Sequence, residues 1–464
     1  EENLLRNKSD ALILIEPTYL KSFSWNRAYS LKYDLTKSIK IDFIANANAR
    51  IDEPPGSIDK ADSDYQAKMD SIWQNMKTMG RITNYNQSLK VNYALPINKL
   101  PLLDWISSSL QYGGDFKWTA APLYKDSLGD YAESPYGNTI ENNRSVSANI
   151  NGNLVNLYNK IPYLKTLNQT TNKPRQNANA RVEAMLNDST GTTDKDTIPL
   201  FKKIADNFLK LLMMTKNASL SYTLAEGTYL PGYRGGMDIL GMDLNNQAPG
   251  WGFVFGDQRD IRPSLVQNNL LSKDSLFNNA YAKRKNENLN GRVSIEPVKN
   301  MKIEITAMRN YTENHSEYFK YDEASNGFRA YSGIDNGSFS LSIITWSTAF
   351  VQDYDDYSNK TFEYFKTIRP EIAAQVAQAS PIWDGTYFTD SITGQLYPNG
   401  YGPTSQDVLI PAFLAAYTGN NPQKYISSKF PRIPLPNWRL TYNGLTEIPW
   451  VKKRFKSATI SHAY

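Results

Sequence analysis

Residues 38–52 read SIKIDFIANANARID, and this stretch decides the fold class. Apolar side chains occupy its odd positions, and polar side chains occupy most of its even positions. Successive side chains of a strand point to opposite faces, so this alternation predicts a β-strand with one apolar and one polar face. We expect the polar residues of the stretch to lie together on one face: Lys40, Asp42, Asn46, Asn48 and Arg50.

The same alternation recurs along the whole chain. In residues 145–154 the apolar Val146, Ala148 and Ile150 alternate with serine and asparagine. Similar runs occupy residues 29–35, 89–95, 110–118, 218–224, 303–307, 339–343, 438–442 and 458–464. Repeated strands of this kind predict an all-β protein with antiparallel pairing. On the polar face we expect Asn149, Asn151 and Asn153 to join the residues of the first stretch.

Two architectures share this period of two. In a soluble sandwich the apolar face points inward, whereas in a membrane barrel it faces lipid and the polar face lines a lumen. A polar face rich in Asn, Ser, Lys and Asp favours the barrel, and so do aromatic residues near the strand ends: Trp25, Trp118, Tyr158, Trp346 and Trp438. We predict an antiparallel transmembrane β-barrel segment with long, partly helical loops, in which the eight polar residues named above face the lumen.

The predicted connections are either very short or very long. Short ones lie at 36–37 and 297–300, whereas 53–80, 227–278 and 351–433 are long loops that we expect to cap or gate the conduit. Residues 159–214 are expected to form a periplasmic connection with short helices. Amphipathic patterns predict helices within 60–79, 362–379 and 404–417. Residues 315–334 fit either one strand or a hairpin.

Apolar–proline pairs recur at Leu100-Pro101, Ile161-Pro162, Ile198-Pro199 and Ile448-Pro449, and in the last three a lysine stands three residues after the proline. Proline suits the first turn of a helix. Two interpretations stay open: short helices that rest on the membrane interface, or tight turns whose apolar residues close the base of a barrel. Both place the motif at one rim.

Composition excludes much catalytic chemistry. The 464 residues include no cysteine and two histidines, His315 and His462, which removes thiolate chemistry and leaves little for histidine-based acid–base catalysis. A net charge of +5 gives no indication of a nucleic-acid partner. Asp353, Asp355 and Asp356 form a weak calcium candidate, but the loop lacks the glycine and final glutamate of an EF-hand. We predict no enzyme activity and no cofactor.

The termini suggest an internal piece of a longer chain. The first residues, Glu1-Glu2-Asn3-Leu4, do not have the basic and apolar regions of a signal peptide. The last residues, Ser461-His462-Ala463-Tyr464, continue a strand-like alternation. No stretch approaches the ~20 apolar residues of a membrane helix.

Several longer stretches carry a resemblance to a known family. They include Tyr112-Gly113-Gly114-Asp115-Phe116-Lys117-Trp118, Leu157-Tyr158-Asn159-Lys160-Ile161-Pro162-Tyr163-Leu164, Ala248-Pro249-Gly250-Trp251-Gly252-Phe253-Val254-Phe255-Gly256 and Pro434-Leu435-Pro436-Asn437-Trp438. These stretches resemble the SprA/Sov family, the giant outer-membrane translocon of the type 9 secretion system of Bacteroidota. The resemblance covers residues 95–438, and residues 1–94 share mainly its texture.

The resemblance implies a function in protein secretion. Family members are several times longer, so residues 1–464 would be one internal arc of a very large barrel in the cell outer membrane. The family passes folded cargo proteins to the cell surface, including adhesins for gliding motility. Its partners would be a PorV-type shuttle protein, a periplasmic plug protein, secreted cargo proteins and outer-membrane lipid. It brings no catalytic residues and no cofactor.

Three other functions remain alternatives at this stage. An uptake or diffusion barrel predicts that this chain closes on itself. A soluble surface β protein, such as an adhesin, predicts solubility without detergent. A hydrolase on a β scaffold is disfavoured by the lack of Cys and the scarcity of His.

Overall fold

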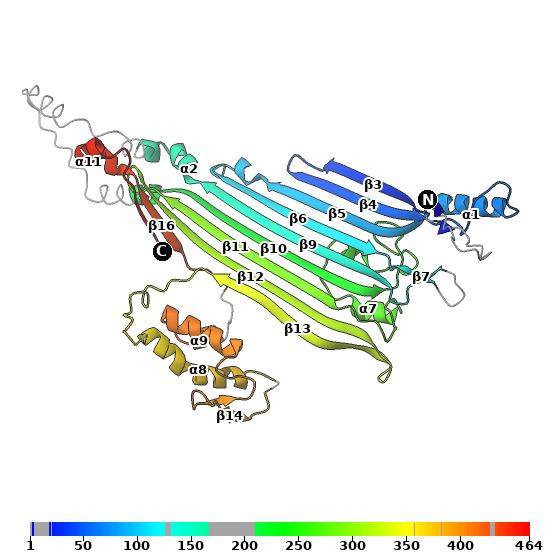
Figure 1. The fold of residues 1–464 in the computed structure, drawn as a ribbon. Coiled ribbons are helices and arrows are strands. Elements are labelled where there is room, and N and C mark those ends of the chain that lie inside the picture. The colour runs from blue at the N-terminus through cyan, green and yellow to red at the C-terminus, as the bar shows by residue number, and fades with distance from the viewer. Residues whose placement is uncertain are drawn as a thin grey trace, which may run out of the picture.

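A single large antiparallel sheet dominates the computed structural model (Figure 1), which describes residues 2–3, 18–19, 21–125, 131–166, 209–356, 358–381, 383–426 and 432–464. The protein is mostly β, with 43% strand and 23% helix. The 11-stranded sheet has the order β17-β16-β12-β11-β10-β9-β6-β5-β4-β3, and β13 also pairs with β12. Its strands are β3 (Phe23–Asp34), β4 (Ile39–Ile51), β5 (Arg81–Leu95), β6 (Ile106–Thr119), β9 (Asn138–Asn153), β10 (Thr215–Tyr233), β11 (Tyr281–Ile295), β12 (Met301–Asp322), β13 (Gly327–Leu341), β16 (Asn437–Tyr442) and β17 (Ile460–Ala463).

The connections separate into two rims of the sheet. The turn rim comprises residues 35–38, 96–105, 154–166, 209–214, 296–300 and 443–459, and it carries the 3-10 helices η1 (Pro96–Lys99) and η2 (Gly444–Glu447) and the helices α2 (Leu154–Lys160) and α11 (Pro449–Arg454). The loop rim comprises residues 52–80, 120–125, 131–137, 234–280 and 323–326, with α1 (Tyr65–Lys77), α6 (Trp251–Val254), α7 (Arg262–Gln267) and the hairpin of β7 (Leu123–Lys125) and β8 (Tyr131–Glu133). Figure 1 shows α2 and α11 at one end of the sheet and α1 and α7 at the other.

One strand position is split by a large insertion. Both β13 and β16 pair antiparallel with β12, β13 along Arg309–Asp322 and β16 along Met301–Thr306. They therefore lie end to end beside β12, and residues 342–436 leave the sheet between them. This insertion holds α8 (Lys360–Gln378), α9 (Gln406–Thr418), α10 (Gln423–Ile426) and the hairpin of β14 (Tyr387–Thr389) and β15 (Leu396–Pro398). Its helices share a core around Ile372, Tyr397, Val408 and Ala412.

The ladder assigns every strand residue to one of two faces. Residues opposite each other share a face, and Ile44, Ser88, Asp115, Asn143, Gly227, Arg284, Asn314 and Asn336 form one row of partners. We call this side the polar face. The opposite side, with the row Ile41, Val91, Tyr112, Val146 and Leu224, is the apolar face. The eight predicted polar residues of β4 and β9 all belong to the polar face, because each is an even number of residues from a member of the polar row on its own strand.

The apolar face is covered over half its height. Near the loop rim the 234–280 loop packs on it, and the core contains Ala45, Ala47, Tyr85, Phe116, Trp118, Ile140 and Leu230 from the sheet and Met242, Phe253, Val254 and Leu265 from the loop. Toward the turn rim the same face is bare, with Leu31, Tyr33, Leu110, Ile150 and Leu220 each more than 40% exposed. We call these regions the covered half and the bare half.

The expected elements can be compared with this arrangement. The helices within 60–79, 362–379 and 404–417 are confirmed as α1, α8 and α9, and residues 315–334 form the hairpin of β12 and β13. The loop expected from 227 begins at 234, because 227–229 pair with both β9 and β11 and extend β10. The loop expected at 351–433 lies within the longer insertion 342–436, which interrupts a strand position at mid-height. In the connection expected at 159–214, residues 167–208 lie outside the described residues.

The sheet stays open. Within the described residues it does not close into a barrel, since β3 forms one edge and β13 with β17 forms the other. An uptake barrel that closes within this chain is therefore not the arrangement found. An edge strand as long as β13 leaves a row of backbone groups able to pair with another strand.

Candidate functional site

The polar face is the largest continuous polar surface of the sheet. Across β9, β10, β11 and β12 it carries mainly hydroxyl and amide side chains: Ser145, Ser147, Asn149, Asn151, Thr223, Ser221, Ser219, Asn286, Asn288, Asn290, Thr312, Asn310 and Thr306. Arg292 is the one charged residue among the rows from Ser145 to Asn151 on these four strands. Neutral amides and hydroxyls bind water without presenting a strong field of either sign. This sector is therefore a polar surface of low charge.

The other sector of the polar face carries charges of both signs. Lys32 lies opposite Asp42, and Lys40 lies opposite Asp34, on β3 and β4. Asp42 also lies opposite Lys90 on β5. Opposite charges directly across a ladder stabilise the pairing and balance one another. The predicted residues Lys40, Asp42 and Arg50 thus belong to a mixed-charge sector, whereas Asn149 and Asn151 belong to the neutral one.

Other predicted polar residues have local partners. Arg50 Nε lies 2.7 Å from Asp52 Oδ1. The side chain of Asn153 accepts a hydrogen bond from the amide of Asn156 at 3.3 Å and so caps α2. Asn46 and Asn48 lie opposite Asn86 and Asn84 on β5. The structure brings all eight residues to one face, in two sectors.

On the apolar face, polar side chains hold the 234–280 loop against the sheet. Strand side chains donate to loop carbonyls: Gln87 Nε2 to Val254 O at 3.2 Å, Tyr112 OH to Phe255 O at 2.6 Å, and Trp118 Nε1 to Gly235 O at 3.3 Å. Asn142 Nδ2 donates to Phe253 O at 3.0 Å and to Asp257 O at 2.7 Å. These bonds satisfy loop carbonyls that the packing removes from water.

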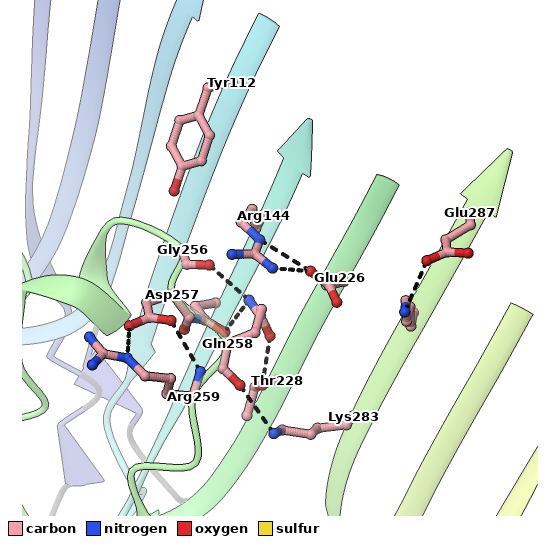
Figure 2. Close-up of polar contacts among 12 residues, drawn as sticks. Tyr112, Arg144, Glu226, Thr228, Gly256, Asp257, Gln258, Arg259, Lys283 and Glu287 are labelled. Atoms are coloured by element: carbon pink, nitrogen blue, oxygen red, sulfur yellow. Dashed lines mark hydrogen bonds and ion pairs between the residues drawn. The ribbon is translucent and has the colours of Figure 1, made fainter. Parts of the chain in front are cut away.

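Gln258 joins the loop to three strands (Figure 2). Its Nε2 donates to Asn142 Oδ1 at 3.1 Å, and its Oε1 accepts from Thr228 Oγ1 at 2.8 Å. Its carbonyl accepts from Lys283 Nζ at 3.1 Å. Gln87, Asn142, Thr228 and Lys283 lie in one row of the apolar face. The hydrogen-bond donors and acceptors of this row therefore match those of the loop that packs on it.

Glycine permits the close approach of loop and sheet. A side chain at Gly114 would place its Cβ 2.3 Å from the carbonyl oxygen of Phe255. In the loop, Gly256 has a φ of +101°, and a Cβ at this position would lie 3.3 Å from the Gly114 Cα. Only glycine meets both demands without strain. The glycine-rich loop therefore packs tightly on the sheet.

Burial and hydrogen bonding compete at Asp243 in the loop. Burial would raise the pKa of the Asp243 carboxyl, but hydrogen bonds from the Asn246 side chain and from the amides of Asn246, Gly236 and Asn245 hold its pKa below the usual value. The pKa values of Asp257 and Asp260 are lowered in the same way, against burial, by Arg259 and Arg262 respectively. The loop is thus ordered around ionised carboxylates.

A charged belt separates the covered half from the bare half. Arg144 Nε donates to Glu226 Oε2 at 3.1 Å, as Figure 2 shows. Next along the sheet, Glu287 lies 2.9 Å from both Lys285 Nζ and Arg309 Nη1. The belt pairs its charges internally, which lowers the cost of placing them on an otherwise apolar face.

The insertion forms an apolar cavity beside the sheet. The cavity has a volume of about 820 Å³ and lies between α9 and the hairpin of β12 and β13. Phe339 and Leu341 line it from β13, and Leu409 and Phe413 line it from α9. Both strand residues belong to the apolar face, so the insertion extends from that side of the sheet.

The other predicted site residues have structural contacts. Asp353 Oδ1 accepts from Asn359 Nδ2 at 2.6 Å, and Asp356 Oδ1 accepts from the amide of Ser358 at 3.0 Å. Over the described ranges, no three His, Asp or Glu side chains are grouped to hold a metal ion. His315 Nδ1 lies 2.7 Å from Asp335 Oδ1, and His462 lies opposite Leu440 at the β17 edge.

The sequence patterns did not predict the row of Gln87, Asn142, Thr228 and Lys283 that binds the loop, which we call the docking row. Gln87, Asn142 and Thr228 are each less than 5% exposed although all three are polar. Each interrupts an apolar alternation, and an interruption at matching height in neighbouring strands is the signal that could have revealed them. Trp118, expected in an interfacial girdle, is 6% exposed because the loop covers it. That expectation was wrong for this residue.

Comparisons with protein-family models and with curated proteins identify no relative. No protein-family model matches the chain. No curated protein matches it either. In the part of the chain that the structure describes, none of the helices combines the length and the apolarity needed to cross a membrane.

Proposed function

We propose that this chain forms part of the wall of a protein-conducting outer-membrane translocon of the type 9 secretion system, as its resemblance to the SprA/Sov family implies. One observation carries the proposal: a single open sheet presents one face that is mainly polar and an opposite face whose bare half is apolar. The wall holds no catalytic centre and no cofactor in this proposal.

The bare half supplies the surface for membrane lipid. On β9 and β10 it presents Val146, Ala148, Ile150, Leu220 and Tyr222. The sheet strands β3 to β6 and β9 to β13 have 12 to 22 residues, and a tilted membrane strand needs about 9–11. The polar face could not contact lipid in its place, because each amide or hydroxyl group without a hydrogen-bond partner in hydrocarbon costs several kcal/mol.

The polar face supplies the surface for cargo. A folded protein that passes a wall must not be held there by strong attraction of either sign. The neutral sector of β9 to β12 meets this requirement, because water competes effectively for its amides and hydroxyls. In this proposal secreted cargo passes along that sector, and the shuttle and plug proteins act on the same conduit.

The open edges support a wall that other strands complete. The backbone groups at the outer edges of β3 and β13 need partners in a membrane, because an unpaired edge is not tolerated in hydrocarbon. Further strands of the same kind would pair there. A soluble surface β protein would instead leave both the bare half and these edges in water, an arrangement that favours aggregation.

Single cysteines test the two faces directly, because the chain has none of its own. Ile150→Cys and Asn151→Cys are neighbours on β9 and point to opposite faces. In membranes, a charged maleimide should label Asn151→Cys at least about tenfold faster, since lipid shields a thiol on the bare half from a charged reagent. Equal, rapid labelling of both would indicate a protein surrounded by water and would overturn the proposal.

Transport requires a second measurement. In cells that carry the variant, a bulky maleimide adduct at Asn151→Cys or Asn288→Cys should slow the appearance of folded cargo at the cell surface. The same adduct at Ile150→Cys, introduced before membrane insertion is complete or with a lipid-soluble reagent, should leave secretion unchanged. Unimpeded secretion with a fully labelled polar face would exclude a role of that face as the conduit wall.

A further inference from the structure

The turn rim gathers short helices that expose large apolar side chains. Leu102 follows η1 and is 62% exposed, and Trp450 in α11 is 63% exposed. Val298, in the turn between β11 and β12, is 56% exposed, and Ile161 and Tyr163 after α2 are also exposed. These residues lie at the rim where the strands of the bare half end. Water alone is a poor environment for such a band of side chains.

The same rim is strongly basic. Its described connections carry ten cations, Lys37, Lys99, Lys160, Lys165, Lys210, Lys299, Lys452, Lys453, Arg454 and Lys456, against three anions, Asp104, Glu296 and Glu447. The loop rim has the opposite balance: residues 52–80, 234–280 and 323–326 hold twelve acidic and seven basic residues. The charge of the protein is therefore divided between the two ends of the sheet.

In α11 the two properties meet within one turn. Val451 is buried and fixes the helix against its neighbours, whereas Trp450 points outward. Lys452, Lys453 and Arg454 follow directly and are exposed. Of the other rim lysines, Lys160 pairs with Asp104 at 2.5 Å and Lys299 pairs with Glu447 at 3.1 Å. These pairs tie neighbouring turns together, while the α11 cations remain exposed at the rim.

We propose that the turn rim is a collar that binds the headgroups of anionic phospholipid. Tryptophan, leucine and isoleucine would enter the boundary between headgroups and acyl chains, as aromatic and apolar anchors do in membrane proteins. The lysines and Arg454 would lie among the phosphates, where each basic residue near an anionic surface adds to binding. The collar fixes the sheet at one height, with the acidic loop rim on the opposite side of the membrane.

This inference rests on the proposal that the bare half faces lipid. Free phosphate and phospholipid share the same anionic group, and the collar commits to phospholipid because its cations are interleaved with exposed apolar anchors. The exposed apolar side chains of Trp450, Leu102 and Val298 would not contribute to the binding of a free anion. Zwitterionic lipid would meet the apolar anchors equally well but would leave the excess of cations unmatched.

Native mass spectrometry of the full chain released from detergent tests the collar. Samples are titrated with phosphatidylglycerol or with phosphatidylcholine, and the bound lipids are counted. The unmodified chain should retain phosphatidylglycerol preferentially. The variant Lys452→Gln/Lys453→Gln should reduce that affinity by about tenfold, given the strength of basic residues near anionic lipid. The control Lys60→Gln/Lys77→Gln removes two exposed cations from the loop rim and should leave it unchanged.

Three results would overturn the collar. The first is equal retention of both lipids, and the second is an equal loss in the control variant. The third is full displacement of phosphatidylglycerol by millimolar inorganic phosphate, which would indicate a plain anion site. A Trp450→Ser variant should weaken retention of both lipids, which separates the anchor from the charge. If the cysteine pair on β9 behaves as expected but one of the three overturning results is obtained, the collar is wrong and the proposed function stands.

Discussion

The covered half and the bare half of the apolar face belong to the same strands but have different environments. In the covered half, Phe116 and Trp118 of β6 are buried by the protein's own loop. Gly114 lies four residues closer to the turn rim than Trp118 and contacts the loop backbone. Leu110, still closer to the turn rim, is exposed. Alternation along the strand is the same in both halves. What covers the apolar face therefore depends on features other than the alternation.

The difference lies in the polar residues that interrupt the covered half. Gln87, Asn142 and Thr228 place amide and hydroxyl groups in the covered half, whereas the bare half carries mainly aliphatic and aromatic side chains. A buried amide is tolerated only where a fixed partner meets it. A loop offers such partners in its carbonyls, whereas lipid tails offer none. The two halves can thus be separated by experiment.

The largest effect is expected from truncation of the core of the covered half. Phe116 contacts Phe253 of the loop edge to face, at 6.2 Å between ring centroids. Phe116→Ala should destabilise the docked loop by about 3–5 kcal/mol, through lost burial and an unfilled cavity. Hydrogen exchange of the amides in 250–257, measured by mass spectrometry in detergent, should accelerate accordingly.

The matched change on the same strand is Leu110→Ala in the bare half. It should alter loop exchange by less than about 0.5 kcal/mol, because no protein atoms depend on that side chain for packing. If both substitutions release the loop equally, the two halves are not independent and the comparison fails.

Adjacent glycines of β6 give a second contrast. Gly114→Ala would bring a methyl group into the backbone carbonyl of Phe255, which cannot move without lifting the loop. We expect a cost of about 1–3 kcal/mol, typical of overpacking. Gly113→Ala points to the polar face, where the nearest atom is the rotatable Ser145 Oγ at 2.4 Å. Limited proteolysis within 234–280 should be faster only for the first variant, and equal rates would argue against close backbone contact.

The docking row gives a third contrast between buried and exposed amides. Asn142→Ala removes the side-chain hydrogen bonds to Phe253 O, Asp257 O and Gln258 Nε2, at a cost of about 1–3 kcal/mol. Asn151→Ala on the polar face removes an amide that water replaces, and should change stability by less than about 0.5 kcal/mol. Urea titrations followed by tryptophan fluorescence measure both. A neutral Asn142→Ala would show that the row does not hold the loop.

Sequence patterns were sufficient for the strands and their faces, and insufficient for what covers them. The period of two predicted Lys40 and Asn46 on one face, because a strand offers only two directions. It could not predict that the chain leaves the sheet after Leu341 and returns at Asn437, since both segments continue the same alternation. Nor could it predict the partners of Asn142, whose nearest loop carbonyl is 111 residues away in the sequence.

The smallest expected effect is a pH dependence of loop docking in the covered half, which the bare half should not share. The pKa of Asp243 is lowered in the folded loop, so its contribution is fully present above the unfolded value of about 3.9 and is lost as the pH falls through the folded pKa. Asp257 and Asp260 act in the same direction. Loop exchange should therefore be constant from pH 7 to about pH 5, after correction for intrinsic rates, and increase below about pH 4. Each effect is small because burial opposes the hydrogen bonds that lower these pKa values. Asp243→Asn should expose the loop already at pH 7, because an amide oxygen cannot accept all four hydrogen bonds that reach the carboxylate, and its response to acid should be weaker than that of the unmodified chain. The aliphatic neighbours of Ile150, such as Ala148 and Leu220, do not titrate, so the labelling of Ile150→Cys should not follow this transition once the rates are corrected for the falling thiolate fraction. A parallel acid response at Ile150→Cys would mean that the sheet itself, and not the docked loop, gives way.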